Sequence, residues 1–330
     1  MPVVHYGERE IRVAAGESLL DALLREGCQV PNSCRAGVCQ SCLLRAEEGR
    51  VPRDAQIGLK ESYRVQGYFL ACRCHPQGDM RVALPRDMDT RVPAEVVARD
   101  LLAGDVLRLR LRPLQGFPYR AGQYVTLWRD ATLGRSYSLA SVPELDDYLE
   151  FHIKVIPSGR FSDWAWQELR VGSRLALQGP NGHCFYAPGS EGQEILLIGA
   201  GTGLAPLYGI LRDALHAAHR GQIHLFHGAA RASGLYLFDE LRALAERKAN
   251  FHYHPSVLYP DDGLLSEVDV GHLDQFALTP SPGVAGSRIY LCGDPGLVNA
   301  LRKRAFLAGA SMSEIYVDAF LPAAQPERAA

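Results

Sequence analysis

The chain has 330 residues, of which 47% are hydrophobic, and a formal net charge of −2 at pH 7. This length and apolar content suffice for two or three hydrophobic cores, at roughly 100–150 residues per domain. A charge so close to zero excludes the strongly basic surface typical of nucleic-acid-binding proteins, and no acidic tail indicates a disordered segment.

The sequence shows no targeting or membrane-spanning segment. Arg9 and Glu10 interrupt the N-terminus before an apolar run of the signal-peptide type can form. The longest apolar stretch, residues 195–211, is broken by glycines and by Pro206. It is also shorter than the roughly 20 residues that a membrane-spanning helix needs. We therefore expect a soluble cytoplasmic protein with no membrane or nucleic-acid partner.

Residues 1–88 form the first predicted domain. Apolar alternation at Val3–Tyr6 and Ile11–Val13 predicts a β-hairpin. Ser18 is a typical residue to begin a helix, and Gly27 is a typical residue to end one. The sequence therefore predicts a hairpin followed by a short helix at the start of this domain.

Four cysteines give the strongest chemical signal in this domain: Cys34, Cys39 and Cys42 in one short loop, and then Cys72. The spacing C-x4-C-x2-C followed by a distant fourth thiol is that of a plant-type [2Fe–2S] cluster. A structural zinc ion is the alternative, although zinc usually takes its ligands from two short knuckles. Cys74 is the alternative fourth ligand. Disulfides are disfavoured, since clustered thiols in a non-secreted chain more often bind metal.

The second predicted domain spans residues 93–189 and follows a charged linker, Pro85–Pro93. Short alternating runs punctuated by glycine and proline predict an antiparallel β-barrel here. The predicted strands are 96–98, 106–111, 124–128, 136–139, 149–155 and 174–177. A short helix is predicted at 161–169.

Two segments of this barrel carry residues suited to a large phosphorylated cofactor. Arg135 and Tyr137 share one face of a strand, with Ser138 on the other. Arginine can hold a pyrophosphate with two hydrogen bonds, and tyrosine offers a ring to an aromatic cofactor. The alternative is that they are ordinary rim residues. The second segment, 157–162, precedes the short helix, whose N-terminus suits a diphosphate. A helix cap alone would explain Ser162.

The third predicted domain spans residues 190–330, where strands alternate with helices. The predicted strands are 195–198, 223–227, 251–258, 289–292 and 315–317. One predicted helix follows the first of these strands and ends near residue 219. Three more are predicted at 239–249, 264–275 and 296–308. This alternation is typical of a doubly wound parallel sheet.

Two loops of this sheet are predicted to hold a dinucleotide. Gly201, Thr202 and Gly203 lie between a strand and a helix, where glycines allow a phosphate to approach the backbone. The spacing departs from G-x-G-x-x-G, so a structural tight turn is the alternative. Cys292 and Gly293 end a later strand at the ligand-binding edge of such a sheet. Cys28 and Cys184 are predicted to be buried, and a buried thiol is also the alternative for Cys292.

These motifs, in this order, resemble the ferredoxin–NADP reductase superfamily, in its subgroup with an N-terminal plant-type ferredoxin domain. The similarity covers nearly all of the 330 residues. Reductase components of bacterial aromatic-ring dioxygenases and of multicomponent monooxygenases have this organisation. The resemblance implies a [2Fe–2S] cluster, FAD and a nicotinamide nucleotide as cofactors, and the oxygenase component as partner.

The resemblance also implies roles for individual residues. Tyr137 would lie against the isoalloxazine, Ser138 near its N5 atom and Arg135 on the pyrophosphate. The other implied contacts are Gly159, Arg160 and Ser162 at the flavin phosphate, Gly201, Thr202 and Gly203 at the nucleotide, Cys292 and Gly293 beside the transferred hydride, and Phe320 over the flavin face.

We expect electrons to pass from NAD(P)H to FAD, then to the cluster, and singly to the partner, because only a flavin exchanges both two and one electrons. Arg231 could bind a 2′-phosphate, and it could equally lie on a ribose or face solvent. Most relatives with this domain order use NADH, which we expect, with NADPH as the alternative. The chain is expected to be a monomer. Rival functions are a stand-alone flavin or ferric reductase and a redox-sensing module.

Overall fold

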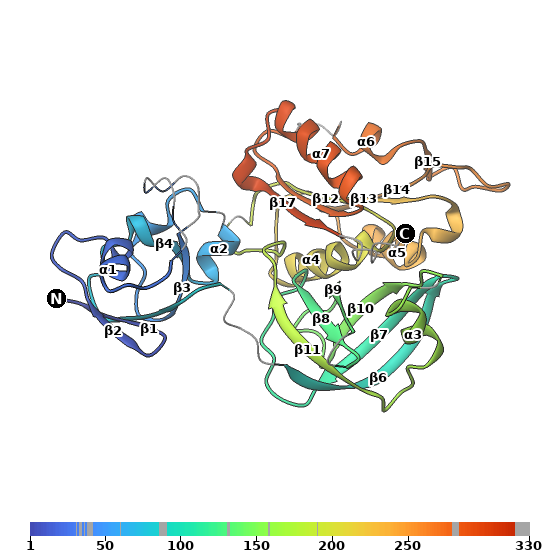
Figure 1. Cartoon of the computed structure of the whole chain (residues 1–330). Helices are drawn as coiled ribbons and strands as arrows, with labels where there is room; N and C mark the ends of the chain where they lie inside the picture. The colour runs from blue at the N-terminus through green and yellow to red at the C-terminus, as the bar shows by residue number, and fades with distance from the viewer. Residues whose placement is uncertain are drawn as a thin grey trace, which may run out of the picture. The chain divides into compact units, whose positions relative to one another are not determined.

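The computed structural model describes residues 1–30, 32, 35, 37, 42–59, 61–85, 91–130, 133–157, 159–189, 191–278 and 284–320 (Figure 1). The chain divides into two compact units, Met1–Asp89 and Thr90–Ala330. The first unit has one hydrophobic core, and the second has separate cores in its barrel and on the two faces of its parallel sheet.

The first unit is a five-stranded β-grasp sheet in the order β2-β1-β5-β3-β4. Its strands are β1 (Val3–Tyr6), β2 (Arg9–Arg12), β3 (Leu43–Glu48), β4 (Tyr68–Leu70) and β5 (Met80–Ala83). Its helices are α1 (Leu19–Arg25) and α2 (Glu61–Val65), with single 3-10 turns η1 (Arg53–Gln56) and η2 (Ala71–Arg73). The hairpin is confirmed, although β2 begins two residues earlier than predicted, because Tyr6 pairs with Arg9 directly across the turn.

The start of helix α1 is also confirmed. The Ser18 hydroxyl accepts a hydrogen bond from the Asp21 N–H (3.2 Å) and donates one to the Asp21 carboxylate (2.6 Å). Gly27 follows the helix with φ of +72°, a conformation that glycine adopts without strain. The cap and the stop together fix where the chain leaves the helix toward the cysteine loop.

The second unit begins with an antiparallel barrel in the order β10-β7-β6-β11-β8-β9. Its strands are β6 (Val92–Ala103), β7 (Val106–Pro113), β8 (Tyr124–Trp128), β9 (Gly134–Ser138), β10 (Leu149–Lys154) and β11 (Arg174–Asn181), and its helix is α3 (Ser162–Gln167). A bridge between Leu139 and Phe151 joins β9 to β10 and closes the barrel.

The predicted linker extends too far, because its last two residues belong to β6. Pro93 pairs with Ala176 of β11 and accepts a hydrogen bond from the Leu114 N–H through its carbonyl (2.8 Å). A proline lacks only the donor, so a strand can begin there. Residues 86–90 of the predicted linker lie outside the described residues.

A parallel sheet in the order β15-β14-β13-β12-β16-β17 completes the second unit. Its strands are β12 (Ile195–Ala200), β13 (Ile223–Ala229), β14 (Phe251–Val257), β15 (Asp269–Val270), β16 (Arg288–Gly293) and β17 (Ile315–Ala319). Its helices are α4 (Leu204–His216), α5 (Phe238–Arg247), α6 (Leu273–Phe276) and α7 (Pro295–Leu307), and further 3-10 turns lie at Gly201–Gly203 (η3), Ala232–Gly234 (η4) and Met312–Glu314 (η5). Strand order reverses between β12 and β16, which makes their carboxyl ends the switch point of the sheet.

The predicted helix over 264–275 is wrong. Only the four residues of α6 are helical, and the strand β15 precedes them. Asp269 and Val270 pair with Ser256 and Val257 of β14, and the Gly271 N–H then donates to the Val257 carbonyl (2.9 Å). The backbone groups of residues 269–271 therefore form hydrogen bonds with the edge of the sheet and are not available for a longer helix.

Helix α4 lies between the parallel sheet and the barrel (Figure 1). Its Arg212 forms two hydrogen bonds of 2.9 Å with Asp146, which follows β9. Next to it, Glu150 and His152 of β10 are buried; their side chains lie 3.1 Å apart, and the His152 Nδ1 atom lies 3.3 Å from the Tyr236 hydroxyl. A polar seam therefore joins the two parts of this unit.

Replacing Glu150 with glutamine is expected to destabilise the second unit more at pH 7 than at pH 3. Burial alone would raise the pKa of Glu150, but His152 and Arg110 outweigh burial and lower it from 4.5 to about 2. The lowered pKa means that the carboxylate stabilises the fold above about pH 4.5, and that this contribution disappears as the pH falls toward 2. The shift corresponds to on the order of 3 kcal/mol.

Melting temperatures of the wild type and E150Q at the two pH values test this expectation. Asp147→Asn is the matched control, since Asp147 pairs with Arg112 on the same barrel but is exposed. An exposed ion pair of this kind contributes at most about 1 kcal/mol. An equal loss of melting temperature for E150Q at both pH values would contradict the ionic role of Glu150.

Candidate functional site

In the first unit, two of the four predicted cluster ligands lie side by side. Cys42 directly precedes β3, and Cys72 lies in the 3-10 turn η2. The Ala71 N–H donates to the Cys42 carbonyl (3.0 Å), so segments thirty positions apart are fixed together. Cys34 and Cys39 lie outside the described residues. Among the residues that are described, no group of three or more His, Cys, Asp or Glu side chains is arranged to hold a metal ion.

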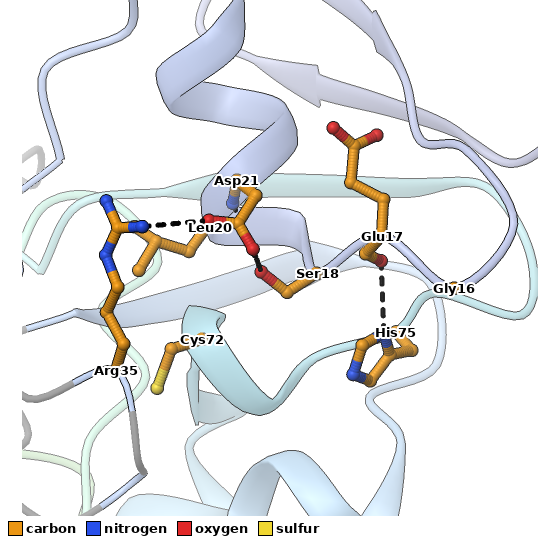
Figure 2. Close-up of a pocket in the computed structure, with 8 residues that line it drawn as sticks. All are labelled: Gly16, Glu17, Ser18, Leu20, Asp21, Arg35, Cys72 and His75. Atoms are coloured by element: carbon orange, nitrogen blue, oxygen red, sulfur yellow. Dashed lines mark hydrogen bonds and ion pairs between the residues drawn. The ribbon is translucent and has the colours of Figure 1, made fainter.

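The Cys72 side chain lines a cavity of about 220 Å³ (Figure 2). The other lining residues are Gly16, Glu17, Ser18, Leu20, Asp21, Arg35 and His75. In Figure 2 the Cys72 sulfur lies between Arg35 on one side and His75 on the other. Arg35 pairs with Asp21 (3.3 Å), and the His75 ring contacts the Glu17 carbonyl (3.0 Å). The thiol therefore lies at a polar, partly charged edge of the domain.

Cys74, the alternative fourth ligand, has different surroundings. It is fully buried among the apolar side chains of the first core, and this burial raises the pKa of its thiol to about 12. A metal or cluster ligand has to be a thiolate. Cys72 lines the polar cavity and its turn is hydrogen-bonded to Cys42, whereas Cys74 does not line that cavity, and this difference favours Cys72 as the ligand. Cys28 is buried as predicted, next to Arg9.

In the barrel, the two predicted flavin segments meet. The rings of Tyr137 on β9 and Phe161 before α3 pack with centroids 5.6 Å apart. The Ser162 hydroxyl accepts a hydrogen bond from the Ile156 N–H (3.2 Å). A Cβ atom at Gly159 would lie 2.5 Å from the Ser162 oxygen, so only glycine fits there. Arg160 is exposed and Arg135 is half-buried.

A contact that sequence reasoning missed joins the barrel to the parallel sheet. The buried Ser138 hydroxyl donates to the Asp318 carboxylate of β17 (2.5 Å). Asp318 is the register partner of Cys292 on β16. Burial raises the pKa of Asp318 to about 6, although the hydrogen bond from Ser138 lowers it in part. The only signal in the sequence was a single acidic residue within the strand Ile315–Ala319.

The predicted nucleotide loop contacts the end of β16. Gly203 and Gly199 pack so closely on Cys292 that a Cβ atom would lie 2.4 Å and 2.9 Å, respectively, from its carbonyl oxygen. The Cys292 sulfur lies 3.7 Å from that of Cys184, and both residues are buried. Burial and the neighbouring Cys184 raise the pKa of Cys292, which keeps it a neutral thiol.

The remaining predicted residues lie at the same edge of the sheet. Gly201 has φ of +55°, and Thr202 beside it is partly exposed. The Phe320 N–H donates to the Gly293 carbonyl (2.8 Å), which holds the end of the described chain against β16. Arg231 follows the carboxyl end of β13 and pairs with Asp261 (2.6 Å). Residues 321–330 lie outside the described part of the chain.

The second unit has open backbone for a dinucleotide and a barrel with an aromatic and a basic side chain, and the first unit has a pair of neighbouring cysteines. These features define a flavin- and nicotinamide-dependent oxidoreductase with an iron–sulfur domain. Residues 4–77 match the family described as 2Fe-2S iron-sulfur cluster binding domain. Residues 93–186 and 197–303 match the oxidoreductase FAD-binding and NAD-binding domains.

Similar proteins agree with this organisation over the whole chain. The ferredoxin–NAD(P)+ reductase component of a naphthalene 1,2-dioxygenase system from Pseudomonas putida is 31% identical over 327 residues, covering 97% of this chain and 98% of that protein. The reductase subunit of an aromatic O-demethylase from an Amycolatopsis species is 32% identical, with the same coverage. A crystal structure of an Amycolatopsis cytochrome P450 reductase superposes with a TM-score of 0.68 at 31% identity, covering 98% of this chain and 99% of that one.

The chain therefore belongs to the family of ferredoxin–NAD(P)+ reductase components that combine 2Fe–2S, FAD-binding and NAD-binding domains. It is an oxidoreductase with the predicted multidomain fold, which combines a ferredoxin-type domain with an antiparallel and a parallel sheet. In the part of the chain that the structure describes, no helix has the length and apolar character needed to cross a bilayer.

Proposed function

We propose that this protein takes electrons from NADH and delivers them, through FAD and a [2Fe–2S] cluster, to the oxygenase component of a multicomponent system. The observation that carries the proposal is the presence of the cysteine pair and the flavin and nucleotide sites in one chain. Relatives that match over 98% of their own length are named as components of a dioxygenase system and of an O-demethylase, which supports an oxygenase as partner.

The residues of the barrel would hold FAD, which would supply the exchange of electrons in pairs with a nicotinamide and singly with a cluster. The protein's own residues would position the reactants. The Ser138 hydroxyl, fixed by Asp318, would face the flavin, and the half-buried Tyr137 would lie along its ring. Phe320 would cover the same ring from the end of β17, and Cys292 would lie beside the nicotinamide as a neutral thiol.

The phosphate contacts are proposed for the same segments as in the sequence prediction. Arg135 would contact the flavin pyrophosphate, together with Gly159, Arg160 and Ser162. The nucleotide would lie on Gly201, Thr202, Gly203 and Gly293. Close packing of Gly203 on the Cys292 backbone supports this placement, since it fixes the loop against the end of β16 at the ligand-binding edge of the sheet.

Cys42 and Cys72 would hold the cluster with Cys34 and Cys39. Cys72 suits this role because its side chain lines a polar cavity and its segment is hydrogen-bonded to Cys42. We propose domain boundaries at 1–88, 93–189 and 190–330. The monomeric state and the cytoplasmic location stay predictions from the sequence.

Purified, anaerobically handled protein provides the test. We expect about two iron and two sulfide ions and one FAD per chain, and NADH should reduce both centres without an added mediator. A supplied oxygenase component should then be reduced with turnover. Zinc in place of iron would overturn the cluster assignment. Rapid turnover with free flavin or ferric ion, but none with any protein acceptor, would favour a stand-alone reductase.

Replacing Asp318 with asparagine is expected to make the protein more stable at pH 7.5 but a slower reductase. The raised pKa means that the wild type loses stability as the pH rises from 3.8 through about 6, where the buried carboxyl ionises. D318N removes this penalty, which is up to about 3 kcal/mol. The asparagine oxygen still accepts from Ser138, so the fold of the site is retained.

Melting curves at pH 7.5 and pH 4, with stopped-flow reduction of bound FAD by NADH, separate the two effects. We expect D318N to melt higher than the wild type at pH 7.5 and at the same temperature at pH 4. FAD reduction should slow by on the order of tenfold, because the charged partner that orients Ser138 is lost. A variant that melts lower at pH 7.5 would show that the ionised Asp318 stabilises the fold.

A further inference from the structure

The acidic residue that a dinucleotide site normally places on the ribose is missing from its usual sequence position. In this fold class an Asp or Glu after the second strand binds the ribose 2′-hydroxyl, whereas a nearby arginine accommodates a 2′-phosphate. The segment after β13 contains Arg231 and no acidic residue before Asp239. By sequence alone, this segment therefore suits a 2′-phosphate.

The structure supplies the missing carboxylate from the next loop. Asp261, which follows β14, pairs with Arg231 through its Oδ1 atom (2.6 Å). Its Oδ2 atom accepts a hydrogen bond from the Ala232 N–H (3.1 Å). The Asp261 carboxylate thus binds both the Arg231 guanidinium and a backbone N–H group. These are the two kinds of donor that would otherwise bind a phosphate.

The two loops are held in this arrangement by their own backbone. The Leu258 N–H donates to the Ala229 carbonyl, and the Tyr259 N–H donates to the Ala230 carbonyl, both at 3.0 Å. The Arg231 guanidinium lies 5.8 Å from the centre of the Tyr259 ring. Asp261 is therefore positioned at the carboxyl end of β13, next to β12 and the predicted nucleotide loop.

We propose that Asp261 is the residue that selects NADH over NADPH in this protein, an inference that rests on the proposed function. Its carboxylate can accept a hydrogen bond from a ribose 2′-hydroxyl. A 2′-phosphate would have to displace Asp261 from Arg231 and then lie beside its negative charge. The negative charges of the 2′-phosphate and of the Asp261 carboxylate would repel each other. The site therefore discriminates against NADPH although it contains an arginine.

A double-mutant cycle on the full-length holoprotein tests the proposal. The variants are Asp261→Asn, Arg231→Ala and the double variant, with Asp262→Asn as the control, which removes the same charge from the adjacent exposed residue. Calorimetry measures the Kd of AMP and of 2′,5′-ADP, a fragment that carries the 2′-phosphate. The ratio of kcat/KM for NADPH and NADH is the second readout.

We expect D261N to raise the preference for 2′,5′-ADP over AMP, and for NADPH over NADH, by at least about tenfold. Adding Arg231→Ala should remove that gain, because the freed arginine is what binds the phosphate. Asp262→Asn should change both ratios less than about twofold. If D261N does not fold, Asp261→Ser replaces it in the cycle.

Unchanged ratios in a folded, FAD-loaded Asp261 variant would overturn the assignment of Asp261. So would a gain for D261N that persists without Arg231. Failure of the proposed function looks different: in that case neither nucleotide would reduce the wild-type FAD, and neither fragment would bind.

Discussion

Replacing Cys72 with alanine is expected to abolish electron delivery to a protein acceptor while leaving NADH-dependent dye reduction intact. The variant removes one of four thiolates from the proposed cluster, and a [2Fe–2S] centre with one ligand missing is lost or becomes labile. FAD and the nucleotide site belong to the other compact unit, so the first transfer does not need the cluster. Reduction of cytochrome c or an oxygenase component should fall by on the order of 100-fold, since four-cysteine ligation is what holds this electron carrier.

Cys74→Ala is the control that the chain itself offers. Cys74 is two positions away, but it is fully buried in the apolar core, and its thiol has a pKa raised to about 12. This variant should keep its iron and its paramagnetic signal after dithionite, at a stability cost of about 1 kcal/mol for a small core truncation. Loss of iron in Cys74→Ala but not in Cys72→Ala would exchange the roles of the two residues. Equal loss of dye reduction and acceptor reduction in folded Cys72→Ala would contradict the proposed order of transfer.

The fold could be predicted from the sequence wherever a strand or helix has a regular pattern of apolar residues within its own segment. The bounds predicted for β8 match the structure to the residue, since Tyr124–Trp128 alternates between the barrel core and the surface. The helix predicted at 264–275 was wrong because its residues follow a pairing with β14 that no local pattern reveals. The prediction also omitted β3, β4 and α2, whose short or charged segments lack a clear period.

Some functional residues could likewise be predicted from the sequence, and others could not. Glycines and cysteines could be found by spacing, because a backbone turn or a cluster requires them at fixed intervals along the chain. Asp318 and Asp261 could not be found, because each acts through a residue from another element. Ser138 and Asp318 are 180 positions apart, and Asp261 meets Arg231 only after two strands have paired. Specific polar contacts between distant loops therefore needed the structure.

Gly203→Ala is expected to impair NADH oxidation severely while the barrel and the iron–sulfur unit stay intact. An added Cβ would lie 2.4 Å from the Cys292 carbonyl oxygen, 2.8 Å from its carbon and 3.1 Å from the Gly293 Cα. All three atoms are backbone, so no side chain can rotate away, and the nucleotide loop must separate from β16. Overpacking of this kind typically costs about 1–3 kcal/mol.

The displacement would act on the reacting groups as well as on stability. A shift of about 1 Å between positioned groups can lower a rate on the order of 100-fold, and we expect a loss of that size in kcat/KM for NADH. Gly192→Ala is the matched control, because it makes the same change just before β12 where nothing lies within 4 Å. Iron and FAD contents and the far-ultraviolet spectrum should be unchanged in both variants. A loop that positions the nucleotide against Cys292 tolerates little displacement. A folded Gly203→Ala variant whose kcat/KM for NADH stayed within about threefold of the wild type would therefore contradict this role of the loop.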